Sequence, residues 1–167
     1  MPRLSTLFTT FAMLSASLVP VLSLTSGIYT ICKVRGDRFC LHMRFGANEE
    51  IQLEPPTGGQ RQQWLVTQVG SEDFILMNSA VGCQVTRGSK DSIDVPICLD
   101  NLGSVVTVSQ APGPAEDAYF IDVPGATPPR IAHDTFVNPM NATFSETNTD
   151  SEGIYTEFRF IRVSDSI

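Results

Sequence analysis

The stretch from Ser26 to Trp64 reads SGIYTICKVRGDRFCLHMRFGANEEIQLEPPTGGQRQQW and decides the fold. Apolar and polar residues alternate in four short runs, at positions 28–31, 39–43, 51–53 and 62–66. Turn-forming residues separate the runs, at Arg35-Gly36-Asp37 and Pro55-Pro56-Thr57-Gly58-Gly59. Short alternating runs between such turns are typical of antiparallel strands. We therefore expect four short strands here and no helix.

The same pattern recurs twice along the chain. Three strand-like triplets stand 45 residues apart and head three units: Tyr29-Thr30-Ile31, Phe74-Ile75-Leu76 and Tyr119-Phe120-Ile121. Three units of four strands predict an all-β protein with the β-trefoil fold, a six-stranded barrel capped by three hairpins. An irregular β-sandwich is the alternative, but it needs no equal repeat. We expect Trp64 to point into the core, because it alternates with Val66. The other core positions predicted in the three units are Tyr29, Leu41, Leu53, Leu76, Val85, Ile121 and Phe158.

The first 23 residues have the composition of a secretory signal. They carry one basic residue, Arg3, no acidic residue, and a mostly apolar run from Leu4 to Leu22. A membrane anchor is the alternative, but the run is rich in Ser and Thr and no basic stop follows it. We expect cleavage near Ser23 and secretion of the β-trefoil domain, residues 24–167.

The charge excludes some partners. Without the leader, 10 basic and 18 acidic residues remain, a net charge of −8. An acidic domain repels nucleic acid and anionic lipid, so we expect neither as a partner, and we expect a monomer.

Four cysteines follow the leader, which suggests two disulfides with three possible pairings in a secreted chain. Cys32 and Cys40 lie symmetrically about Gly36, so a hairpin that turns there brings them face to face. Cys83 and Cys98 then form the second bridge. The spacings are not those of a zinc site, and we expect no metal and no cofactor.

The longest irregular segment, Thr135 to Gly153, is polar, and we expect an exposed loop. It contains Asn141-Ala142-Thr143, a predicted acceptor for N-glycosylation in a secreted protein. The tripeptide Arg35-Gly36-Asp37 is read as a solvated turn and not as an integrin ligand. There is no nucleophile or phosphate-loop motif, and no catalytic partner stands at a characteristic spacing from His42 or His133. We therefore expect no enzymatic activity.

Several of these residues resemble the first unit of secreted fungal ricin-B-type β-trefoil lectins. The likeness is carried by Ser26 to Ile31, Cys40-Leu41, Ile51 to Leu53, Gly58-Gly59 and the signature Gln62-x-Trp64. It continues to about Leu99, and the bridge Cys83–Cys98 resembles the within-unit disulfide of the family. Val106 and Phe158 stand where two further Trp residues would be. The resemblance implies a glycan as partner.

The departures concern the sugar site that the resemblance implies. The Asp that follows Cys-Leu in such lectins is His42 in the first unit and Gln84 in the second, while Asp134 is near this position in the third. Arg61 replaces a usual Asn. A sugar site needs carboxylates or amides for paired hydroxyls, and an aromatic face such as Phe45. The candidate carbohydrate-binding residues are therefore His42, Gln60, Arg61, Gln62, Gln84 and Asp134.

The outline also resembles fungal trefoil protease inhibitors such as the mycocypins, which implies a protease as the alternative partner. Their activity lies in projecting loops. The candidate loops are Val34 to Arg38, with Arg35, and Thr86 to Ile93, with Arg87 and Lys90, because a basic residue on a rigid loop fits a trypsin-like pocket. A secreted effector that kept the fold without binding sugar is a third reading.

Overall fold

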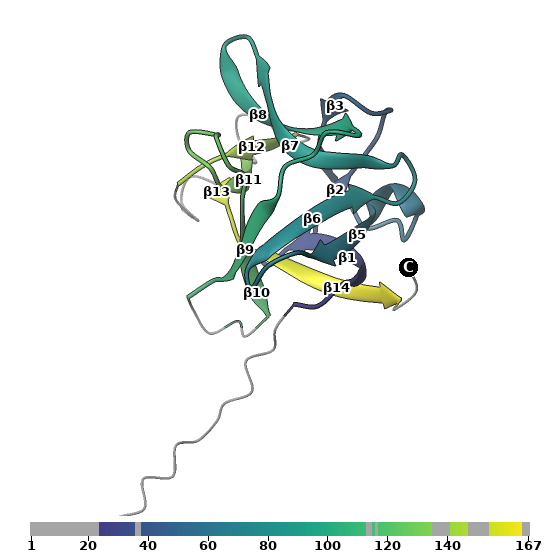
Figure 1. The fold of residues 1–167 in the computed structure, drawn as a ribbon. Helices are drawn as coiled ribbons and strands as arrows, with labels where there is room; N and C mark the ends of the chain where they lie inside the picture. The colour runs from purple at the N-terminus through teal and green to yellow at the C-terminus, as the bar shows by residue number, and fades with distance from the viewer. Residues whose placement is uncertain are drawn as a thin grey trace, which may run out of the picture.

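The computed structural model describes residues 24–35, 38–112, 115, 117–134, 141–146 and 154–164, and it is built from short β-strands (Figure 1). The expected leader, residues 1–23, lies outside this part of the chain, as do Gly36 and Asp37 of the first turn. Among the described residues, no helix is long and apolar enough to cross a membrane.

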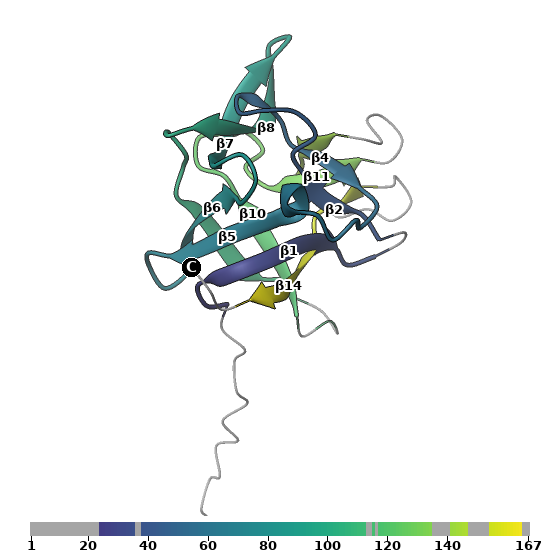
Figure 2. The same ribbon diagram turned by 90° about the vertical axis from the view of Figure 1, so that its right-hand side faces the viewer.

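Six strands form a closed barrel. They are β1 (Gly27–Lys33), β5 (Gln63–Gln68), β6 (Asp73–Asn78), β9 (Val106–Gln110), β10 (Ala118–Asp122) and β14 (Phe158–Ser164). Each pairs antiparallel with its two neighbours, in the order β1, β5, β6, β9, β10, β14. The ring closes because β14 pairs with β1 (Figure 2). Each unit of the sequence repeat contributes its first and fourth strand to the ring.

Three hairpins lie at one end of the barrel. They are β2 (Cys40–His42) with β4 (Gln52–Glu54), β7 (Cys83–Lys90) with β8 (Ile93–Asp100), and β11 (Ile131–Asp134) with β12 (Ala142–Phe144). The barrel and its three hairpins confirm the predicted β-trefoil. Three elements were not expected: β3 (Glu49–Glu50) pairs with β8, β13 (Ile154–Tyr155) pairs with β11, and a 3-10 helix, η1, spans Gln60–Gln62.

The predicted core is confirmed. All nine positions are at most 4% exposed: Tyr29, Leu41, Leu53, Trp64, Val66, Leu76, Val85, Ile121 and Phe158. The indole Nε1 of Trp64 donates a hydrogen bond to the Leu41 carbonyl oxygen at 3.1 Å, so its polar atom is satisfied inside the core. Val106 and Phe158, which stand where the lectin family has Trp, are both fully buried.

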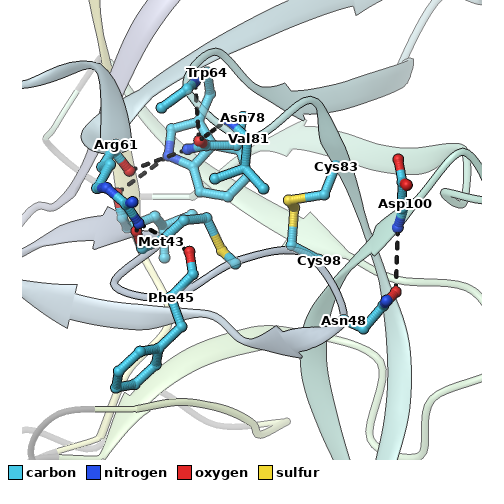
Figure 3. Close-up of a disulfide and its surroundings, with 12 residues drawn as sticks. Met43, Phe45, Asn48, Arg61, Trp64, Asn78, Val81, Cys83, Cys98 and Asp100 are labelled. Atoms are coloured by element: carbon cyan, nitrogen blue, oxygen red, sulfur yellow. Dashed lines mark hydrogen bonds between the residues drawn. A yellow bond between two sulfur atoms is a disulfide. The ribbon is translucent and has the colours of Figure 1, made fainter.

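Both predicted disulfides are present. Cys32 and Cys40 are direct partners in the β1–β2 pairing and are bonded to each other. Cys83 and Cys98 join β7 to β8 (Figure 3). Each bridge therefore ties two strands within one unit.

Two segments differ from the expected loops. Strands β7 and β8 are paired as far as Lys90 and Ile93, so the predicted loop from Thr86 to Ile93 is a long hairpin that projects from the body of the molecule (Figure 1). Its turn is at Asp91-Ser92, where both residues have positive φ, 51° and 68°, as a two-residue hairpin turn requires. Within the expected loop 135–153, the described part, 141–146, contains strand β12, whose Ala142 and Phe144 are buried.

Candidate functional site

The first-unit hairpin places four side chains on the face that points away from Leu41 and Leu53, called its outer face below, although Cys40 and His42 are buried there. In the β2–β4 pairing, Leu41 lies opposite Leu53, and both point into the core. Because side chains alternate across a strand, the neighbouring positions share the other face. They are Cys40, His42, Gln52 and Glu54.

Burial favours the neutral form of His42 on this face. The residue is 9% exposed, and burial lowers the pKa of its imidazole; the nearby Arg61 and Arg44 act in the same direction, against the carboxylate of Glu54. The imidazole Nδ1 lies 3.5 Å from the Oε2 of Glu54. The neutral ring therefore offers one nitrogen as a hydrogen-bond acceptor.

Two buried polar atoms on this face have no hydrogen-bond partner among the described residues. They are the Nδ1 of His42 and the Oε1 of Gln52, which is directly opposite in the pairing; both atoms are buried. Buried polar atoms are nearly always hydrogen-bonded, so such a pair needs a partner from water or from a ligand. Glu54, whose side chain is 20% exposed, adds carboxylate oxygens beside them.

Arg61 is turned back onto the chain that precedes it. Its Nη1 donates to the carbonyl oxygens of Met43, Arg44 and Phe45, each at 2.9 Å (Figure 3). Its own carbonyl oxygen accepts from the Met43 N–H and from the Asn78 Nδ2, both at 3.0 Å. Arg61 thus fixes the loop after β2, with its Nη1 engaged by backbone carbonyl oxygens.

The signature residue Gln62 is also engaged within the fold. It is fully buried, its Nε2 donates to the Pro55 carbonyl oxygen at 2.9 Å, and its Oε1 accepts from the Thr57 N–H at 2.6 Å. It therefore shapes the turn between β4 and η1. Its neighbour Gln60 is exposed.

The other two predicted sugar-site residues belong to different units. Gln84 on β7 packs against Gly103, where an added Cβ would come within 2.0 Å of the Gln84 Cβ. Asp134 ends β11 and lines a hollow together with Glu50 and Lys90. The structure therefore places Arg61 near His42 and Gln62 beside Glu54, while Gln84 lies on β7 of the second unit and Asp134 on β11 of the third.

The basic residues predicted for protease inhibition all have acidic partners. Arg35 lies 3.3 Å from a Glu157 carboxylate oxygen, and its side chain is 45% exposed. Arg87 lies 3.6 Å from Asp94 and also donates to the Gly125 carbonyl oxygen. Lys90 lies 2.5 Å from Glu50.

The predicted acceptor Asn141 is half-buried at the start of β12. Its side-chain Nδ2 donates to the Oε2 of Glu50, and its backbone forms a bridge with Gln52. Asn141 thus connects the third unit to the first.

Two residues of the first-unit face, Gln52 and Glu54, were not predicted as site residues. The alternation of Ile51 to Glu54 was the available signal, because it sets Gln52 and Glu54 on the side opposite Leu53. The register that brings them to His42 depends on the turn between β2 and β4, which the residue pattern does not fix. No cluster of three or more His, Cys, Asp or Glu residues suited to a metal ion occurs in the described part of the chain.

No protein-family model and no curated protein sequence matches the chain. Solved structures do match. The ricin B-like lectin of Macrolepiota procera, in complex with lactose, has a TM-score of 0.64 and 14% identity, over 84% of this chain and 98% of that chain. The designed three-fold symmetric protein ThreeFoil has a TM-score of 0.64 and 13% identity, over 82% and 99%. The lectin of Polyporus squamosus, bound to a sialylated epitope, has a TM-score of 0.57 and 15% identity, over 83% and 50%.

The molecule therefore has the β-trefoil fold of the ricin B-like lectins. At these identities the likeness extends to the fold alone.

Proposed function

We propose that the protein is a secreted, non-enzymatic, lectin-like protein that binds glycans on the outer face of the first-unit hairpin. The observation that carries the proposal is the partly exposed Glu54 carboxylate beside two buried polar atoms without a hydrogen-bond partner, His42 Nδ1 and Gln52 Oε1. Sugar hydroxyls both donate and accept hydrogen bonds, and a carboxylate accepts from them strongly. The ricin B-like fold supports the same reading by analogy.

Secretion is part of the proposal. Both bridges, Cys32–Cys40 and Cys83–Cys98, persist in an oxidising compartment. The composition of residues 1–23 supports a leader that directs the chain there. In such a protein Asn141 remains a predicted glycan acceptor.

The site is small and lacks the aspartate expected from the resemblance. An imidazole and an amide each give one uncharged acceptor, so we expect weak monovalent binding to simple sugars, with a Kd of about 1 mM. Calorimetry with galactose, lactose and chitin oligomers tests this. His42→Ala and Glu54→Gln should each weaken binding about tenfold or more, while the exposed Val69→Ala is the matched control.

Two outcomes decide against the proposal. Binding that survives both His42→Ala and Glu54→Gln would place the site elsewhere. If no glycan binds, and a trypsin-like protease is blocked in a way that Arg35→Ala abolishes, the inhibitor reading replaces it. That alternative has one favourable observation, the partly exposed Arg35 in the loop that the Cys32–Cys40 bridge closes.

A further inference from the structure

The projecting hairpin carries two adjoining hollows on one face. In the β7–β8 pairing, Gly88 lies opposite Val95 and Lys90 opposite Ile93, so these four residues share that face. Hollows of about 280 and 310 Å³ lie there. Both are lined by Glu50, Lys90 and Val95, so the two hollows adjoin at the Glu50–Lys90 ion pair, and we call them together the groove.

All three units contribute to this groove. Its walls include β3 of the first unit, the hairpin of the second, and β11 and β12 of the third. The apolar part of the lining consists of Ile93, Val95, Ile97 and Ala142. The acidic part consists of Glu49, Glu50, Asp91 and Asp134, against one basic residue, Lys90. An apolar surface with a net negative rim suits a ligand with positive charges and apolar ring faces.

One cation already lies in the groove, the ammonium of Lys90, which is paired with Glu50. The Lys90 Nζ lies 2.5 Å from the Oε1 of Glu50, while the other oxygen of Glu50 accepts from Asn141. The Lys90 side chain is 60% exposed and that of Glu50 is 17% exposed. The carboxylate is therefore fixed in the wall, whereas the ammonium reaches it from solvent on a flexible stem.

We propose that this groove binds a cationic amino-sugar oligomer, with a ligand ammonium replacing that of Lys90 on Glu50. The proposal rests on the glycan-binding function, and it names a second site and a ligand class for it. Each protonated amino sugar brings an ammonium for a carboxylate and a ring face for the aliphatic lining, and the two adjoining hollows favour an oligomer over a monomer.

The test compares two hexamers that differ only at the amino nitrogen, which is a free ammonium in one and acetylated in the other. Calorimetry at pH 6 measures binding of hexaglucosamine and of hexa-N-acetylglucosamine to the full disulfide-bonded domain. Hexaglucosamine should bind at least about tenfold more tightly, because acetylation removes the ammonium groups. Glu50→Gln should weaken binding of hexaglucosamine about tenfold. Lys90→Met should strengthen it a few-fold, because the internal competitor is gone while the apolar stem remains.

A structural role for Lys90 would have the opposite effect, since loss of the Glu50–Lys90 pair would then loosen the hairpin and weaken binding. If Glu50→Gln does not fold, Asp134→Asn provides the second test and should also weaken binding. Equal binding of both hexamers, or weaker binding by Lys90→Met, overturns the proposal. Hexalysine that binds as tightly as hexaglucosamine overturns the assignment to glycans.

His42→Ala separates this site from the first-unit site. Binding of hexaglucosamine that is lost in His42→Ala and kept in Glu50→Gln overturns the groove and supports the proposed function. Binding that is lost in Glu50→Gln and kept in His42→Ala supports the groove, even if neutral sugars do not bind.

Discussion

Arg61 illustrates what a single residue reveals only in three dimensions. The resemblance to lectins sets it at a ligand position, yet its guanidinium holds the carbonyl oxygens of Met43, Arg44 and Phe45. Figure 3 shows the Phe45 ring directed away from this contact, and Phe45 is 54% exposed. The sequence could not predict this role, because it depends on the path of a loop with no regular pattern. Trp64, by contrast, was predictable from alternation with Val66.

Trp64 should be the costliest single truncation in the molecule. Trp64→Ala should lower the free energy of unfolding by about 3–5 kcal/mol, because it leaves a cavity in the core. Trp64→Phe keeps most of the ring and loses the hydrogen bond to Leu41, so it should cost less. Urea unfolding followed by circular dichroism measures both, since the chain has one Trp and the variants lack that fluorophore. A loss below ~1 kcal/mol for Trp64→Ala would contradict the buried role.

His42 should make stability depend on pH. Burial, the largest cause, lowers its pKa, so near and below pH 6.5 the folded chain binds fewer protons than the unfolded chain. The contribution of neutral His42 to the free energy of unfolding is therefore complete above about pH 6.5, the pKa of histidine in the unfolded chain. It is lost as the pH falls from there towards the lower pKa of His42 in the folded chain. Urea unfolding at pH 7.5 and 5.5 should show a smaller decrease for His42→Gln than for the wild type. Equal decreases would mean that His42 is not desolvated.

Among the elements, the β7–β8 hairpin differs most from the expected pattern. Gly88, inside the expected loop from Thr86 to Ile93, lies within β7 beneath Ile97, where an added Cβ would come within 2.7 Å of that side chain. The turn of the hairpin is at Asp91-Ser92, and both of these residues adopt the left-handed backbone conformation. The sequence could not show which of these residues form the turn, because a glycine is found at positions of close packing as well as in turns.

The Cys83–Cys98 bridge should be the main covalent support of this hairpin. It closes a loop with a sequence separation of 15, against 8 for Cys32–Cys40. Since the stabilisation grows with loop length, replacing Cys83 and Cys98 with Ala should cost about 3 kcal/mol, and replacing the other pair about 2.5 kcal/mol. Urea unfolding of both double variants gives the comparison. A cost below about 1 kcal/mol for the Cys83–Cys98 pair would mean that strand pairing alone holds the hairpin.

At the scale of the whole molecule, the 45-residue interval was enough to predict the ring of six strands, because equal units close on one another by the same pairings. The hollows beside the hairpin were not predictable. They form where Glu50, Lys90 and Asp134 of three different units meet, and no local pattern encodes a contact between units.

The closed ring should tolerate new chain ends. Ile28 pairs with Ser164, so the two ends of the domain lie side by side. A permuted chain that joins them by a short linker and opens at the exposed Ser71, between the first two units, keeps every strand pairing. We expect a native circular dichroism spectrum and one cooperative urea transition. A broad, non-cooperative transition would show that the turn at Ser71 is needed for the pairing of β5 with β6.

The pairing of β1 with β14 also determines when the barrel can close during synthesis of the chain. The partners Ile28 and Ser164 are 136 residues apart, so the first strand made waits for the last one. At about 5–20 residues per second, that wait lasts on the order of ten seconds, during which β1 has an open edge. The two cysteine pairs are close neighbours along the chain and meet well before that. Both cysteine pairs of a newly made chain can therefore come together before its barrel closes.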